Sequence, residues 1–168
     1  LDLSGPINKE GKVRGRFVGA LQSREDTIDY YNVDKGVFYG VIEADISEST
    51  KLTVGASHQK TDAGGTMWGG LPASDVTGNL IDWAKGSGLG TDWTGWKTNV
   101  TDVFTSVDHT FENGWEGRIA YAFQQNKFDA PLLYVYGNPD LETGLGMKTL
   151  AAHFIGDRQQ HALTASLN

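Results

Sequence analysis

Cysteine is absent from the sequence, and methionine and proline are scarce, with two and four residues among 168. Without cysteine the chain has no disulfide scaffold, no thiol nucleophile and no cysteine-ligated zinc site. No apolar run approaches the 18 residues that predict a transmembrane helix. The N-terminus also has no positively charged and then apolar stretch, so no uncleaved secretory signal is expected.

Positive charge is in the minority. The chain carries 14 Lys and Arg against 21 Asp and Glu, a formal net charge of -7, and the basic residues form no cluster. Because a nucleic-acid surface depends on basic patches, no nucleic-acid partner is expected. Five Trp, six Tyr and seven Phe argue against disorder, and the 22 Gly have no three-residue period, which excludes collagen.

Apolar and polar residues alternate with a period of two along most of the chain, which is typical of strands. In residues 13–24, for example, Val13, Phe17 and Leu21 share one face, while Arg14 and Arg16 lie on the other. With residues 1–5 read as the end of a further strand, we expect about eight strands and no helix beyond one possible turn at 79–85. The alternating segments are residues 13–24, 36–46, 51–62, 99–111 and 115–128, with a weaker pair at 147–157 and 160–168.

The predicted connections alternate strictly between two lengths. Tight turns are expected at residues 6–12, 47–50, 112–114 and 157–159, and longer loops at 25–35, 63–98 and 129–146. Outer-membrane barrels have this arrangement, with short periplasmic turns and long external loops. The charges also concentrate on one face of the predicted strands, as in a wall between lipid and a polar lumen. The charged residues of that face are Arg14, Arg16, Glu43, Asp45, Asp102, Asp108, Glu116 and Arg118.

Four of the five tryptophans lie within the predicted loop at 63–98. They are Trp68, in the sequence Thr-Met-Trp-Gly-Gly-Leu-Pro, and Trp83, Trp93 and Trp96. Exposed loop aromatics commonly bind flat or apolar parts of a ligand, such as a sugar or an aromatic chelator. The alternative is that the loop packs on itself around these rings. In the next predicted loop, Tyr134 and Tyr136 either contact the same ligand or extend a strand beyond the membrane.

No enzyme signature is present in the sequence. The four histidines lie at no metal-ligand spacing, and none has a Ser or Asp nearby in a nucleophile motif. The glycine-rich residues 86–90 lack the strand-to-helix context of a phosphate-binding loop. We therefore expect no catalytic residue and no protein-held metal. The histidines are His58, His109, His153 and His161.

Three stretches resemble the barrel of TonB-dependent ferric-siderophore receptors, especially those for coprogen, rhodotorulic acid and pyoverdine-type chelates. They are DLSGPINKEGKVRGRFVG at residues 2–19, VIEADISESTKLTVGASHQKTD at 41–62 and WGGLP at 68–72. The most specific parts are Ser4-Gly5-Pro6-Ile7 with Gly11 and Arg14, Glu43-Ala44-Asp45, and Trp68-Gly69-Gly70-Leu71-Pro72. Residues 73–98 match the family poorly.

The resemblance implies a 22-stranded outer-membrane barrel of a Gram-negative cell, filled by an N-terminal plug. Such a receptor imports an iron chelate with energy delivered through the TonB protein. Residues 1–168 would then be a partial barrel domain of about eight strands in contact with outer-membrane lipid. The sequence shows no signal, energy-coupling box, plug or aromatic C-terminal strand end, so we expect an internal segment.

The resemblance also implies which residues contact the ferric siderophore. Trp68 is the first candidate, followed by Tyr134 and Tyr136, and then by Trp93 and Trp96. The siderophore's own oxygens would hold the iron, so no protein ligand and no cofactor are expected. Two alternatives stay open from the sequence. One is a complete eight-stranded outer-membrane barrel acting as an adhesin or structural anchor, and the other is a soluble β-sandwich that binds carbohydrate.

Overall fold

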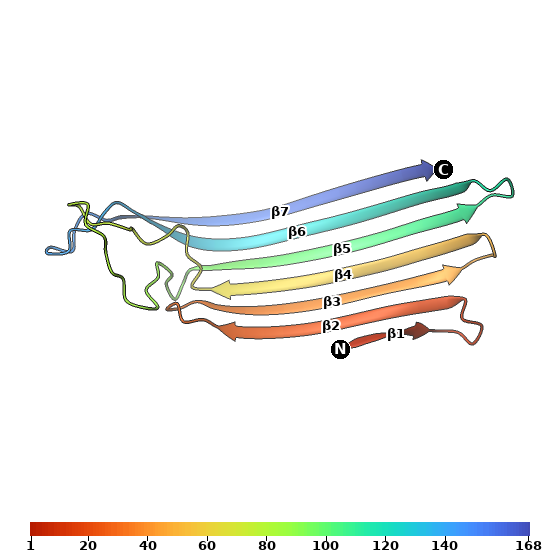
Figure 1. Cartoon of the computed structure of the whole chain (residues 1–168), viewed down its shortest axis with the longest axis horizontal. Coiled ribbons are helices and arrows are strands. Elements are labelled where there is room, and N and C mark those ends of the chain that lie inside the picture. Colours follow the sequence, from red (N-terminus) through yellow and green to blue (C-terminus); the bar gives the residue numbers. More distant parts are fainter.

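The computed structural model describes residues 1–168 and contains one antiparallel sheet of seven strands in the simple order β1 to β7 (Figure 1). Each strand pairs with the next one along the chain, so the sheet is a continuous meander. The strands are β1 (Asp2–Pro6), β2 (Val13–Glu25), β3 (Asn32–Asp45), β4 (Thr50–Gly64), β5 (Gly95–Thr110), β6 (Glu116–Tyr136) and β7 (Lys148–Leu167).

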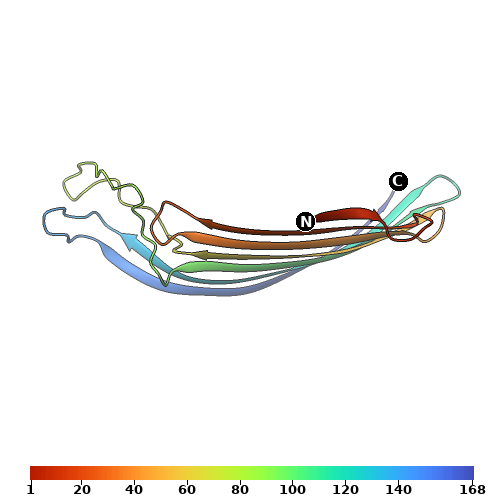
Figure 2. The same cartoon turned by 90° about the horizontal axis from the view of Figure 1, so that it is seen from below.

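The sheet is long and curved (Figure 2). β6 has 21 residues and β7 has 20, about twice the 9–11 residues with which a strand crosses a bilayer. β1 and β7 form the two edges of the sheet and do not pair with each other. The chain has no helix of the length and apolarity needed to traverse a membrane.

The pairing register gives the sheet one apolar and one polar face. Paired residues point to the same side, so a row such as Ile42, Val54, Thr105, Tyr121 and Leu163 belongs to what we call the apolar face. The apolar part of this face forms an oblique band, ending at Leu21 in β2 but already at Leu163 in β7. Beyond the band, the same face carries Lys60, Asn99, Lys127 and Asp157. Strands that are tilted within a barrel wall produce such an oblique band.

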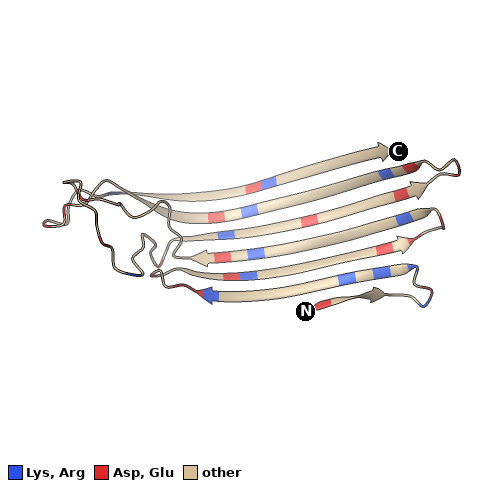
Figure 3. Cartoon of the chain, viewed as in Figure 1, with Lys and Arg blue, Asp and Glu red and all other residues tan.

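Ionic residues form two bands across the sheet, and the part of the sheet between the bands is almost free of them (Figure 3). On the polar face, Arg14 contacts Asp45 at 2.6 Å, and Arg118 contacts Asp108 at 2.8 Å. The charges predicted to share a face therefore do so. Asp102 is the one charged residue in the middle of β5, where it accepts hydrogen bonds from Ser57 and Gln124.

The chain buries very little of itself, with only 12 of 168 residues buried. The buried apolar side chains, Val33, Ala63, Ala130 and Leu132, lie toward the ends of β3, β4 and β6 that carry the larger loops. Large apolar side chains such as Ile119 and Leu163 are more than 60% exposed. Because a sandwich needs a second packed sheet, the single layer contradicts the soluble carbohydrate-binding alternative.

The structure has seven strands where the sequence predicted about eight. The expected turn at 157–159 was wrong, because residues 148–167 form one strand that pairs with β6 throughout. Asp157 accepts hydrogen bonds from Gln125 and contacts Lys127, so these polar residues form cross-strand pairs instead of a turn. The predicted pair at 147–157 and 160–168 is therefore β7. Because β1 and β7 do not pair with each other, the chain does not form a closed eight-stranded barrel.

The connections also differ in part from the prediction. The short turns at residues 7–12, 46–49 and 111–115 lie at one end of the sheet, as expected (Figure 1). At the other end, residues 26–31 form a connection no longer than 7–12, so the alternation of lengths is not strict. The possible helical turn at 79–85 was wrong, because Leu80 forms an isolated bridge with Ser74 and the residues after it are irregular.

Candidate functional site

Three loops meet at the end of the sheet opposite the short turns (Figure 2). They comprise residues 26–31, 65–94 and 137–147. The amide of Asp29 donates to Gly86 O at 2.9 Å, and the amide of Val76 donates to Pro139 O at 3.0 Å. The long central loop therefore contacts both of its neighbours and is held in one place by backbone hydrogen bonds.

Two aspartates organise turns within these loops. The Asp75 carboxylate accepts hydrogen bonds from the Thr77 hydroxyl at 2.7 Å and from the amides of Thr77 and Asn79. The Asp140 carboxylate accepts from the amides of Glu142 and Thr143. The hydrogen bond from the Thr77 hydroxyl is the main cause that lowers the pKa of Asp75, and a hydrogen bond from the Thr143 side chain is the main cause that lowers the pKa of Asp140. Both carboxylates are therefore held ionised as turn-forming groups.

An aromatic cluster forms where the central loop crosses β6 and β7, and its members are Trp68, Tyr134, Tyr136 and Phe154. Trp68 forms a parallel bridge with Tyr134, and their ring centres are 5.4 Å apart. Phe154 meets the Trp68 ring edge-on at 5.1 Å, and Tyr134 stacks on Tyr136 at 5.9 Å. Tyr134 and Tyr136 are 38% and 46% exposed, so the cluster is ordered yet open on one side.

The remaining sequence candidates lie outside the aromatic cluster. Trp96 belongs to β5 and stacks on Phe128 of β6 with ring centres 6.2 Å apart. Trp93 lies in the central loop and is 48% exposed. Trp83 donates its Nε1–H to Pro72 O at 2.8 Å, which fixes the loop after the Trp-Gly-Gly-Leu-Pro segment. Trp83 is therefore a packing residue, which is the second of the two roles considered for the loop tryptophans.

The structure adds Phe154 and Phe128, which the sequence did not single out. Both lie within strands on the polar face of the sheet, away from the loops. The sequence indicated only loop aromatics as ligand contacts. The alternation through 147–157 already placed Phe154 on one face of a strand. Only the register of β6 with β7 brings it under Trp68.

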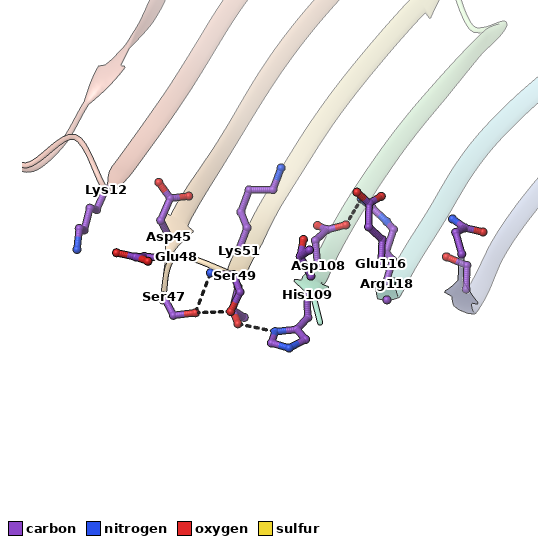
Figure 4. Close-up of a pocket in the computed structure, with 15 residues that line it drawn as sticks. Lys12, Asp45, Ser47, Glu48, Ser49, Lys51, Asp108, His109, Glu116 and Arg118 are labelled. Carbon is purple, nitrogen blue, oxygen red and sulfur yellow. Dashed lines mark hydrogen bonds and ion pairs between the residues drawn. The ribbon is translucent and has the colours of Figure 1, made fainter. Parts of the chain in front are cut away.

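A cavity of about 660 Å³ lies at the short-turn end of the sheet, and no hydrophobic residue lines it (Figure 4). Charged side chains of alternating sign cross neighbouring strands there: Asp45, Lys51, Asp108 and Arg118. His109 shares a hydrogen bond with the Thr50 hydroxyl at 2.8 Å. Each of the four charges has an ion-pair partner: Asp108 pairs with Arg118, Asp45 with Arg14 and Lys51 with Glu43, as expected for a charged rim of a sheet.

No group of three or more His, Asp or Glu side chains is arranged to hold a metal ion. The histidines are spread over the apolar face of the sheet, where His58 pairs with Thr101 and His161 with Tyr121. The aromatic cluster is therefore the arrangement best suited to bind a ligand, and its chemistry is that of flat, partly exposed rings.

Known proteins resemble the chain over almost its whole length. No family model matches it. A ferripyoverdine receptor of Pseudomonas aeruginosa is 35% identical over 167 residues, which cover 97% of this chain and 20% of that receptor. The chain thus spans about a fifth of the length of the curated relatives it matches first.

Solved structures give the same result. The crystal structure of the outer-membrane ferripyoverdine receptor of Pseudomonas aeruginosa bound to ferripyoverdine matches with a TM-score of 0.91 at 34% identity. The match covers 99% of this chain and 22% of that one. A complex of FpvAI with pyocin S2 matches with the same TM-score, identity and coverage. The expected fold, a segment of an antiparallel barrel wall, is confirmed.

Proposed function

Because the chain is a barrel segment of the TonB-dependent ferric-siderophore receptor family, we propose that it forms part of an outer-membrane receptor that imports a ferric siderophore. Receptors of this family are transporters and not enzymes. Pyoverdine-type chelates are the proposed ligand class, because the relatives that match most of the chain are pyoverdine receptors. Residues 1–168 would supply a part of the barrel domain, and the remaining strands and the plug would come from other parts of the receptor.

The two faces of the sheet support this placement. The apolar band would contact outer-membrane lipid, and the polar face, with its Arg14–Asp45 and Arg118–Asp108 pairs, would line the lumen. The three contacting loops would then lie on the external side, where a chelate arrives. The TonB protein would act through the plug region and would make no contact with the strands described here.

The observation that carries the proposal is the aromatic cluster at the loop end of the polar face. Trp68 is held against Tyr134 and Phe154 by the isolated bridge and by ring packing, so its position is fixed before a ligand binds. A preorganised ring loses little conformational entropy on binding. The half-exposed Tyr134 and Tyr136 offer further area to the same ligand. Trp93 would contribute from the same central loop and Trp96 from β5.

The chemistry of iron is consistent with the residues present. Hard oxygen ligands of the siderophore would hold Fe³⁺, so the protein needs to recognise only the outer surface of the chelate. Aromatic rings and hydrogen-bonding tyrosine hydroxyls suit the flat and amide-bearing parts of such a molecule.

The test is Trp68→Ala in the full-length receptor that contains this segment, with ferripyoverdine as the ligand. We expect binding to weaken by about 1–3 kcal/mol, as for other aromatic anchors. Trp115→Ala is the matched control, because Trp115 is 50% exposed in the short turn at the opposite end of the sheet.

Equilibrium titration of ligand binding and thermal unfolding should be measured on both variants. If Trp68→Ala binds ferripyoverdine like the wild type and only lowers stability, Trp68 is a packing residue and the proposed site is wrong.

A further inference from the structure

A separate cavity of about 260 Å³ opens on the polar face of β5, β6 and β7. It is lined by Trp96, Thr98, Asn126, Phe128 and Arg158. In the register, Phe128 pairs with Thr98 on one side and Gly156 on the other, and Asn126 pairs with Arg158. The cavity therefore follows from strand pairing and does not depend on loop conformation.

Arg158 has no partner in the chain, unlike most arginines of the sheet. Arg14, Arg16, Arg24 and Arg118 all form ion pairs with aspartates, whereas Arg158 forms neither an ion pair nor a side-chain hydrogen bond. Its chain neighbour Asp157 points to the opposite face and contacts Lys127 there. The Arg158 side chain is exposed, so its permanently charged guanidinium is available to an anion from outside residues 1–168.

A second polar group of the same cavity, the side-chain amide of Asn126, also has an atom without a hydrogen-bond partner. Its Oδ1 atom is buried and accepts no hydrogen bond. A buried acceptor without a donor destabilises the folded state. A guanidinium carries five N–H donors, so Arg158 can donate one to Asn126 and still present two parallel donors to an anion.

Two aromatic rings form one wall of the cavity. Trp96 and Phe128 are stacked at 6.2 Å, and the Phe128 ring lies directly over Gly156, which has no side chain to displace it. Apolar walls reduce competition by water and so strengthen a charge-assisted hydrogen bond. Phe154, Gly156 and Arg158 follow one another along the polar face of β7, so this cavity lies on the same path as the aromatic cluster.

We propose that this cavity is a second binding subsite, which takes a carboxylate on the Arg158 guanidinium. The inference rests on the proposed function, since it places the cavity on the inner wall of a receptor barrel. The carboxylate has two possible sources, an acidic group of the ferric chelate or an acidic side chain of the receptor segment that fills the lumen. Planar, bidentate pairing with the guanidinium is the same in either case.

The experiment uses the full-length receptor with Arg158→Gln and Arg158→Lys. Lys60→Gln is the matched control, because Lys60 is exposed, forms no ion pair and lies on the apolar face. Two probes are titrated, ferripyoverdine and ferripyoverdine whose free carboxyls have been converted to amides. Limited proteolysis of the lumenal segment is measured on the same samples. If Arg158→Gln fails to fold, Arg158→Lys, which keeps the charge, is compared with Lys60→Gln instead.

If the chelate supplies the carboxylate, Arg158→Gln weakens ferripyoverdine binding by about ten- to a hundredfold, as for a lost charge-assisted hydrogen bond. Arg158→Lys then weakens ferripyoverdine binding less than Arg158→Gln does. The amidated chelate binds Arg158→Gln and the wild type with the same affinity. If the lumenal segment supplies it, chelate affinity is retained and the segment is cleaved faster in Arg158→Gln than in Lys60→Gln.

The inference is overturned if Arg158→Gln matches Lys60→Gln in both readouts. A wild-type receptor that does not bind ferripyoverdine would instead refute the proposed function. The proteolysis comparison would still report on the subsite in that case, so the two failures are distinguishable.

Discussion

Single glycines decide where several aromatic rings lie on this sheet. The Phe104 ring covers Gly55 on the neighbouring strand, and Phe128 covers Gly156 in the same way. A side chain at either glycine would occupy the space of the ring. Phe104 also stacks near Tyr39, with centres 6.4 Å apart, so the Gly55 position supports a ring pair that extends over β3, β4 and β5.

Gly55→Ala should destabilise the barrel by about 1–3 kcal/mol, because the new methyl group forces the Phe104 ring out of its place. Gly19→Ala is the control, since a Cβ at that glycine meets nothing within 4 Å. Urea unfolding of the full-length receptor in detergent micelles, followed by tryptophan fluorescence, measures both free energies. Equal effects of the two substitutions would contradict this role for Gly55.

Among the candidate site residues, the sequence identified Trp68, Tyr134 and Tyr136 from loop composition and family resemblance. The structure brings these three together and leaves Trp93 and Trp96 apart from them. It adds Phe154 from β7. Contact between Trp68 and Phe154 could not be predicted, because 86 positions separate them and no periodicity relates a loop residue to a distant strand.

At the scale of elements, alternation located the strands well and their ends poorly. The strands β2 to β5 lie where period-two patterning predicted them. The sequence left open whether β6 extends to Tyr136, and it predicted a turn where β7 continues through Asp157. Residues 130–136 are apolar or aromatic on both faces, and residues 156–160 are polar or glycine on both faces, so apolar alternation marks the strand in neither stretch.

The apolar face makes a directional prediction for β4. Val54 lies in the middle of the apolar band and is 46% exposed, and Thr53 points to the polar face. Val54→Arg should destabilise the inserted barrel by about 2–4 kcal/mol, because it places a charge near the bilayer midplane. Thr53→Arg should have a much smaller effect, since the lumen is hydrated.

The free energy of unfolding in lipid vesicles measures this difference between the two arginine variants. Similar stabilities would show that the apolar face of β4 does not contact lipid. The assignment of the apolar face to lipid and of the polar face to the lumen would then be wrong.

At the scale of the whole molecule, the chain is a single curved layer whose two edges have no partner. β7 has 20 residues, all paired with β6 on one side and with nothing on the other. An open edge of this length is unfavourable in lipid and promotes association in water. Most large apolar side chains are also uncovered. We therefore expect the segment to depend on further strands for its stability.

Residues 1–168 expressed alone should not give a cooperatively unfolding monomer in detergent-free buffer. We expect aggregated or unfolded material, because folding the segment buries too few side chains and leaves the β7 edge open. Circular dichroism during thermal unfolding, combined with size-exclusion chromatography, measures this. A monomeric, two-state transition would show that the single layer is stable by itself.

The sequence by itself determined that the chain is an all-β wall with one apolar and one charged face, since a period of two is a local property of neighbouring residues. Its Trp-Gly-Gly-Leu-Pro segment and N-terminal strand also indicated the receptor family. The tertiary structure alone decided the register, which places Phe154 beneath Trp68 and Asn126 beside Arg158. Register depends on hydrogen bonds and packing between strands far apart in the chain, so only the assembled sheet shows which of these side chains meet.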